Sequence, residues 1–239
     1  MKKVNTPNKT IGEIVAEDYR TAQVFEKYGI DFCCGGKEDL ATTSRDKNID
    51  LSVITAELEE VQKEPRERSQ DYDSWELPFL SDYIVTVHHS YLNDNIEQIG
   101  TYANKIAEVH GSSHPEVIEI ASLFKKLGSD LESHLRDEEE EFFPALKRVY
   151  AQKKAGQTSA EEDTAIIRKS LENFKDEHEE VGDALHKIRH LSKDFDIPAN
   201  VCNTYVITYE KLKEFEDDIH KHVHLENNIL FPKAMKLCE

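Results

Sequence analysis

A His-x-x-x-Glu pair occurs twice in this chain, and it constrains the fold more than any other feature. The upstream copy is His134 and Glu138, and the downstream copy is His222 and Glu226. In both copies a proline follows the glutamate by six residues. A spacing of four residues places the two side chains of each pair on one face of an α-helix. The repetition therefore predicts two long helices, each presenting one imidazole and one carboxylate.

The rest of the chain also favours long helices. Only 9 Gly and 7 Pro occur in 239 residues, while 33% of the residues are charged, a composition more typical of helices than of a sheet. Apolar residues recur in steps of three and four, the period of a helix with one buried face, over 80–95, 120–138, 167–188 and 205–229. The breaks between these stretches are short, which predicts antiparallel neighbours in a four-helix bundle.

The first 60 residues read as a small helical unit. Thr10 and Glu13 form a capping box at the start of one helix, and Gly29 reads as the C-cap of a second. Cys33-Cys34-Gly35-Gly36 follows as a tight turn, and a further helix is expected over 51–63. The all-α chain is therefore predicted to consist of a small helical domain (1–63), a polar linker (64–74) and the four-helix bundle (75–239).

Six polar residues occupy stripe positions where an apolar residue is expected. They are His88, His134, Glu138, His178, His222 and Glu226. A buried carboxylate without a partner costs several kcal/mol, so an imidazole on every helix together with two carboxylates predicts shared cations. Each helical hairpin supplies a lone histidine and a His-x-x-x-Glu pair, which would place four imidazoles and two carboxylates around two metals. This ligand set suits iron or manganese, and no thiolate on the stripes favours a structural zinc.

Each of these signals has an ordinary explanation when it is taken alone. A single inward histidine is more often a core residue, and a single His–Glu pair is more often a surface ion pair. The joint occurrence on four inward faces favours the metal site. The other histidines receive no ligand role: His89, His220 and His224 are expected off the inward face, His186 and His190 off the third stripe, and His110 and His114 in a loop. Pro144 and Pro232 are expected to kink or end their helices.

Charge and hydropathy narrow the partners and the compartment. A net charge of −18 would repel a nucleic-acid backbone, and no apolar run approaches the ~20 residues of a membrane span. The first residues lack the apolar core of a signal peptide. We therefore expect a cytoplasmic protein without nucleic-acid or membrane partners, in which the 4 Cys are reduced.

Cys33 and Cys34 are candidates for chemistry. A bond between adjacent cysteines would close a strained ring, so the pair favours thiol exchange or capture of a soft metal. The alternative is that two small residues merely fill a turn. Cys202 and Cys238 lie in no recognisable pattern, and no role is assigned to them.

These features together resemble a known family. The bundle resembles the hemerythrin-like proteins, but it departs from the oxygen-carrying members, which have a histidine where this chain has Glu226 or Gly182. With the Cys-Cys-Gly-Gly turn and Leu-Glu-Asn-Asn-Ile-Leu-Phe-Pro over 225–232, nearly the whole chain resembles the repair-of-iron-centres family. The resemblance implies two non-haem iron ions, oxo- or hydroxo-bridged, at the six inward polar residues. It also implies repair of iron–sulfur proteins damaged by nitric oxide or peroxide, and a homodimer.

Several functions fit this pattern. The first is an iron donor, with Cys33 and Cys34 acting as an iron relay or in thiol chemistry. The second is a nitric oxide reductase or oxidase at the same di-iron site, and the third is a gas sensor or oxygen store. A purely structural bundle is the fourth, so the sequence leaves open whether the protein is an enzyme.

Overall fold

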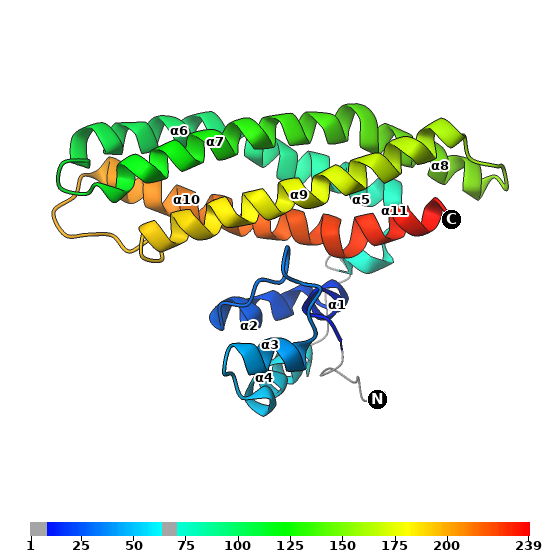
Figure 1. The fold of residues 1–239 in the computed structure, drawn as a ribbon, viewed down its shortest axis with the longest axis horizontal. Helices are drawn as coiled ribbons and strands as arrows, with labels where there is room; N and C mark the ends of the chain where they lie inside the picture. The colour runs from blue at the N-terminus through cyan, green and yellow to red at the C-terminus, as the bar shows by residue number, and fades with distance from the viewer. Residues whose placement is uncertain (1–8, 64–70) are drawn as a thin grey trace.

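The computed structural model describes residues 9–63 and 71–239, and it is built from helices and turns (Figure 1). Within these ranges the β pairing is limited to an isolated bridge between Thr10 and Asp39. The all-α prediction is confirmed. Of the predicted linker, 64–70 lies outside the described residues, and Tyr72–Ser74 forms a short 3-10 helix, η4.

Four long helices of the described chain run antiparallel along the long axis of the molecule (Figure 1). Three of them change from α to π geometry and back, and we count each through its π turn. In order, the bundle helices are α5 (Leu77–Tyr83) with η5 (Ile84–His89) and α6 (Ser90–His110); α7 (Glu116–Asp137) with η6 (Glu138–Phe142) and α8 (Phe143–Lys154); α9 (Glu161–Leu191); and α10 (Asn203–Leu225) with η7 (Glu226–Leu230) and α11 (Phe231–Leu237). The predicted four-helix bundle is confirmed.

The small N-terminal unit contains α1 (Ile11–Glu17), η2 (Tyr19–Thr21), α2 (Ala22–Lys27), α3 (Leu40–Asp46) and α4 (Leu51–Lys63). The predicted capping box is present, because the Glu13 amide donates to Thr10 Oγ1 at 3.1 Å and the Thr10 amide donates to Glu13 Oε2 at 2.9 Å. Gly29 follows α2 with a φ of 60°, as a left-handed C-cap requires.

Helix α3 is absent from the sequence prediction. It has only seven residues, which is too short to show a helical period. Its start depends on a local cap, in which Asp39 accepts a hydrogen bond from the Thr42 amide at 2.8 Å.

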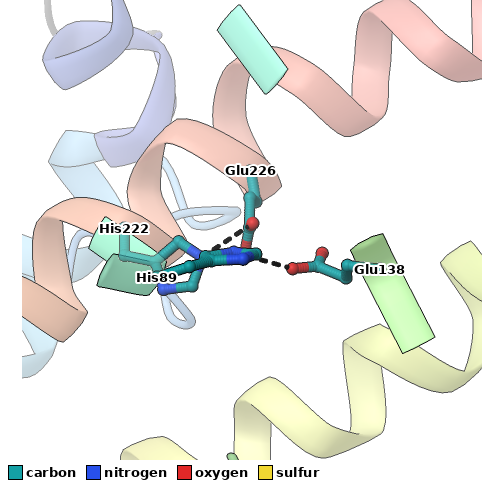
Figure 2. Close-up of side chains that lie close together, drawn as sticks. All are labelled: His89, Glu138, His222 and Glu226. Carbon is teal, nitrogen blue, oxygen red and sulfur yellow. Dashed lines mark hydrogen bonds and ion pairs between the residues drawn. The ribbon is translucent and has the colours of Figure 1, made fainter. Parts of the chain in front are cut away.

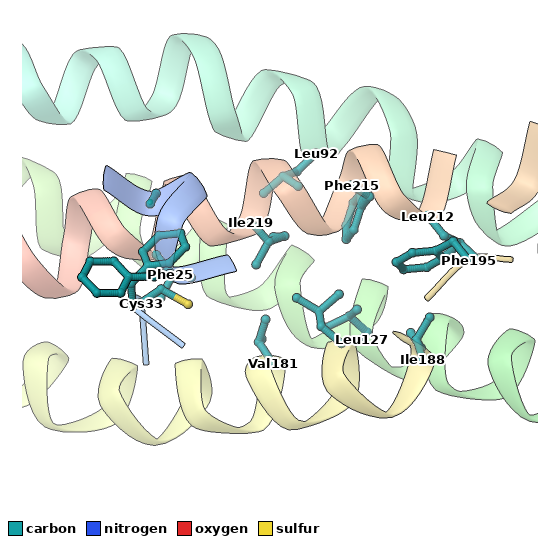
Figure 3. Packing of buried hydrophobic residues seen from close by; sticks show 14 of the residues in the cluster. Phe25, Cys33, Leu92, Leu127, Val181, Ile188, Phe195, Leu212, Phe215 and Ile219 are labelled. Carbon is teal, nitrogen blue, oxygen red and sulfur yellow. The ribbon is translucent and has the colours of Figure 1, made fainter. Parts of the chain in front are cut away.

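The N-terminal unit lies along one side of the bundle (Figure 1). A single buried cluster crosses the boundary, so that Phe25 and Cys33 share it with Leu92 and Ile219 of the bundle (Figure 3). The apolar core extends across the predicted boundaries at 63 and 75 and does not divide the chain there. The two-domain division therefore stays a prediction.

A buried ion pair joins α9 to α10 within the bundle. Glu216 is fully buried and accepts hydrogen bonds from Nε of Arg189 at 3.0 Å and from Nη2 of the same guanidinium. Burial raises the pKa of Glu216, although Arg189 opposes the shift. The charge of Glu216 is therefore tolerated because a cation lies against it.

We expect Arg189→Met to lower the free energy of unfolding by about 2–3 kcal/mol at pH 7, because it leaves a buried carboxylate without a cation. The expected loss of stability is modest because the Arg189 side chain is 34% exposed. A folded-state pKa above the unfolded value means that the loss grows as pH rises and shrinks towards pH 5. Denaturant titrations at the two pH values check this. Adding Glu216→Gln should restore most of the loss at pH 7, and an equal loss at both pH values would contradict the assignment.

Candidate metal centre

Polar side chains from all four bundle helices meet in the interior at the level of the π turns. They form two groups whose potential ligand atoms lie within 4.8 Å of one another. The first group is His89, Glu138, His222 and Glu226 (Figure 2), and the second is His134, His178 and Glu226. All of these side chains are buried.

Glu138 faces a histidine of each group. Its Oε2 lies 3.3 Å from Nε2 of His89 and 3.6 Å from Nε2 of His134. Figure 2 shows the carboxylate pointing from the start of η6 towards His89. A carboxylate in this position can be shared by two cations.

Glu226 also faces a histidine of each group. Its Oε1 lies 2.8 Å from Nε2 of His222, in the first group, and its Oε2 lies 3.3 Å from Nε2 of His178, in the second. The His222–Glu226 contact is the i, i+4 pair that the sequence repeat predicts. The first group therefore combines two imidazoles with two carboxylates, and the second combines two imidazoles with Glu226, while Glu138 lies 3.6 Å from its His134.

The hydrogen bonding of these groups fits a cation site. Within the described chain, neither oxygen of the fully buried Glu138 has a hydrogen-bond partner, and the same holds for Nε2 of His89 and Oε2 of Glu226. Buried polar atoms without partners are costly, and a carboxylate is the costliest of them. Divalent cations would satisfy these donor atoms together, so the residues fit a pair of metal ions.

Three of the four imidazoles are oriented from outside. In each, Nδ1 is held by an acceptor, which leaves Nε2 directed at the carboxylates. The pairs are His89 with Glu139 at 2.7 Å, His134 with Glu177 at 2.6 Å, and His178 with Asn227 at 3.0 Å.

The pKa values of these side chains also fit a metal site. Burial lowers the pKa of His222 to about 4, so the ring is neutral at pH 7 and keeps a lone pair for a metal. Burial and the charge of Glu226 both raise the pKa of Glu138. Burial would also raise the pKa of Glu226, but His222 and His178 outweigh it and hold this pKa well below its usual range. Two carboxylates this close resist joint ionisation unless cations lie between them.

The sequence of this chain is similar to those of known proteins. The family model for the hemerythrin HHE cation binding domain matches residues 81–234, and a domain of unknown function, DUF542, matches residues 7–62. The iron-sulfur cluster repair protein ScdA of Staphylococcus epidermidis is 31% identical over 96% of this chain and 99% of its own length. The iron-sulfur cluster repair protein YtfE of Escherichia coli is 30% identical over 95% of this chain and 97% of its own length. The chain belongs to the iron–sulfur cluster repair family. Its bundle is a hemerythrin domain with a di-metal site of histidine and glutamate.

In this family member His89 lies among the two metal groups, whereas His88, the ligand predicted from the sequence, lies beside them. His88 is equally buried, with Nδ1 2.9 Å from Asp218 and its ring stacked on His222 at 5.7 Å. Its Nε2 also has no hydrogen-bond partner in the described chain, so His88 stays a predicted ligand. His134, Glu138, His178, His222 and Glu226 are brought together in the two groups.

The π turn η5 buries two adjacent histidines. A π turn adds one residue to the helical repeat, and Ile84, His88 and His89 are all buried along it. Val87, which the uniform stripe placed inward, is 40% exposed. Helical steps of four and three back from Leu92 lead to His88 and His89 respectively, so the sequence period does not separate the two histidines.

Two further expectations can be compared with the structure. His224, expected off the inward face, lies outside the metal groups and is fully buried beside Asn228 and the ring of Tyr19 from the N-terminal unit. Pro144 and Pro232 do not end their helices, because each is the second residue of the α-helix that follows a π turn. A proline cannot donate to the carbonyl four residues earlier, which favours the wider turn before it.

The predicted cysteines lie close to the second metal group. Cys33, Cys34 and Asp31 form a third group of potential ligands, with the two Sγ atoms 3.8 Å apart. Cys34 donates to the backbone oxygen of His178, with a separation of 3.2 Å. The turn therefore touches the residue that carries one of the inward imidazoles.

We expect His89→Ala to reduce bound metal from about two ions per chain to about one, because it removes an imidazole from the first group. His88→Ala is the matched control, and it should retain the full metal content. Metal analysis after reconstitution with Fe(II), with circular dichroism to verify folding, checks both variants. The opposite pattern would restore the assignment of His88.

Glu138→Leu should change stability and metal content in opposite directions. Without metal, the variant should unfold at higher denaturant than the native chain, since replacing an uncompensated buried charge stabilises by about 1–4 kcal/mol. Its metal content should fall below two per chain, and Glu226→Leu should also fall below two. If both variants still bind two ions, the carboxylates are not ligands.

Proposed function

We propose that this protein restores damaged iron–sulfur proteins by donating iron held at the di-metal site. The proposed ligands are His89, His134, Glu138, His178, His222 and Glu226. The observation that carries the proposal is Glu138, a fully buried carboxylate that faces a histidine of each group and has no hydrogen-bond partner in the described chain. The relatives named as iron–sulfur cluster repair proteins support the same role.

The ligand chemistry supports iron as the metal. Mixed imidazole and carboxylate ligation suits iron or manganese, whereas thiolates would favour zinc. The two metal groups contain only histidine and glutamate. We propose two non-haem iron ions that share Glu138 and Glu226, with an oxide or hydroxide between them.

A cavity supports the release of a cation from this site. About 650 Å³ of space opens between α7 and α9 and reaches His134, and its wall contains Glu177 together with Asp130 and Glu180, both paired with Lys126. The hydrogen bond from His134 lowers the pKa of Glu177, so this carboxylate is charged at neutral pH. Glu177 therefore offers a cation an oxygen ligand between His134 and solvent.

The cysteine turn supports an onward transfer. A hydrogen bond with Cys34, together with burial, raises the pKa of Cys33 well above its usual range. The thiol therefore keeps its proton until a metal displaces it. Such a group binds iron weakly at neutral pH, which is suited to passing the ion on. We propose Cys33 and Cys34 as the relay, with Asp31 as an additional oxygen ligand.

Damaged iron–sulfur proteins are the proposed partners. A homodimer and a cytoplasmic location complete the proposal, the former from the family resemblance and the latter also from the sequence. None of the helices in the described ranges is long and apolar enough to cross a membrane.

Iron transfer can be measured directly. The iron-loaded protein is mixed with the apo form of a [2Fe–2S] ferredoxin, sulfide and a thiol reductant. We expect cluster absorbance to appear in the ferredoxin as iron leaves the donor. Cys33→Ser/Cys34→Ser should bind the same iron but transfer it several-fold more slowly, because the relay ligands are missing. Cys202→Ser, which is distant from the relay in sequence, is the matched control.

Two results would overturn the proposal. Iron that stays bound while no cluster forms would exclude donation. Catalytic consumption of nitric oxide, with a reductant present and iron retained, would favour the nitric oxide reductase alternative at the same site.

A further inference from the structure

Two adjacent asparagines of η7 hold the turn of residues 32–36 against the bundle. Asn227 donates from Nδ2 to the backbone oxygen of Cys33 at 3.3 Å, and Asn228 donates from Nδ2 to that of Phe32 at 3.1 Å. They differ in their second contact. Asn227 Oδ1 lies 3.0 Å from Nδ1 of His178, whereas Asn228 contacts His224. Of the two asparagines, Asn227 therefore contacts both the turn and a histidine of the metal groups.

The turn reaches the same histidine from a second side. Cys34 donates its thiol hydrogen to the backbone oxygen of His178 at 3.2 Å. This approach requires a small residue one helical turn further along α9, where a Cβ on Gly182 would lie 3.3 Å from Cys34 Sγ. The turn thus contacts the backbone of His178 directly and its imidazole through Asn227.

These contacts make the two metal groups unequal. His178 belongs to the group with His134 and Glu226, and not to the group of His89 and His222. Among the described contacts, none joins His89 or His222 to the turn. The contacts of the turn therefore act directly on His178, a member of one of the two groups.

We infer that Asn227 is a positioning residue that couples docking of the Cys33–Gly36 turn to metal retention at His178. The inference rests on the proposed metal centre. An acceptor on Nδ1 fixes the ring of a histidine ligand with Nε2 directed at the metal. Asn227 supplies that acceptor while its amide nitrogen is held by the turn. When the turn leaves, the Asn227 side chain loses this anchor and holds the ring less firmly.

Thermodynamic linkage makes the coupling between docking of the turn and metal binding reciprocal. If docking of the turn strengthens metal binding at His178, metal binding strengthens docking by the same factor. Undocking then loosens the metal beside His134 and His178, while the metal beside His89 and His222 is unaffected. The releasable metal is therefore the one nearest to the two cysteines.

Hydrogen exchange and metal release test the coupling in the full-length protein. Backbone exchange over 31–36 is measured without metal and after loading with two equivalents of Fe(II), and release is followed with a ferrous chelator. In the native chain, loading should slow exchange in the turn by about fivefold or more, and iron should leave in two phases. Asn227→Ala should lose the metal-dependent slowing and accelerate one phase only.

Two further variants separate the roles of the side chain. Asn227→Asp cannot donate to Cys33, so it should lose the metal-dependent slowing. Its carboxylate is a stronger acceptor than the amide oxygen and still holds the His178 ring, so iron should leave in the same two phases as in the native chain. Asn228→Ala is the matched control. It loosens the turn in both states but keeps the acceptor on His178, so the ratio of the exchange rates between the two states should match the native chain.

The outcomes separate this inference from the function on which it rests. A native chain that does not bind two irons would overturn the proposed metal centre itself. A native chain that binds two irons, with Asn227→Ala showing the same metal-dependent slowing and the same release, would overturn the coupling alone. Binding of a single iron by Asn227→Ala, with the slowing abolished, would support it.

Discussion

The burial of two carboxylates inside a helical bundle is the constraint on which the rest of the structure depends. Glu138 and Glu226 are fully buried, and each faces one histidine of each metal group. An apolar interior does not tolerate such charges without cations. The same carboxylates that would destabilise a metal-free bundle are those that two metals could share, so metal affinity and fold stability are linked through the same atoms.

The π turns are the local device that makes the site. Three bundle helices leave α geometry at this level, and the turns include His89 in η5, Glu138 in η6 and Glu226 in η7. A π turn adds a residue and rotates the following side chains relative to the preceding ones. The bundle thus keeps an apolar stripe on both sides of the site while it directs ligands inward between them. Pro144 and Pro232 follow two of these turns and favour them.

The N-terminal unit completes the centre from outside the bundle. Its core is continuous with that of the bundle, and its cysteine turn lies against His178. A buried thiol with a raised pKa is a poor resting ligand, so the turn is suited to receiving metal rather than storing it. In the proposed function, storage in the bundle and transfer at the turn would be separate tasks, joined through the residues between Cys33 and His178.

The amino-acid sequence by itself determined the all-α class, the four long helices, the capping box at Thr10 and most of the inward polar residues, because helical periodicity and i, i+4 pairs are local properties. It missed α3, which is too short to show a period, and it did not single out His89. Only the tertiary structure placed His89 among the metal groups, because the extra residue of a π turn is adopted when packing on both sides of it demands a change of register. The contact between Cys34 and His178 likewise required the fold, since 144 residues separate the two in the chain.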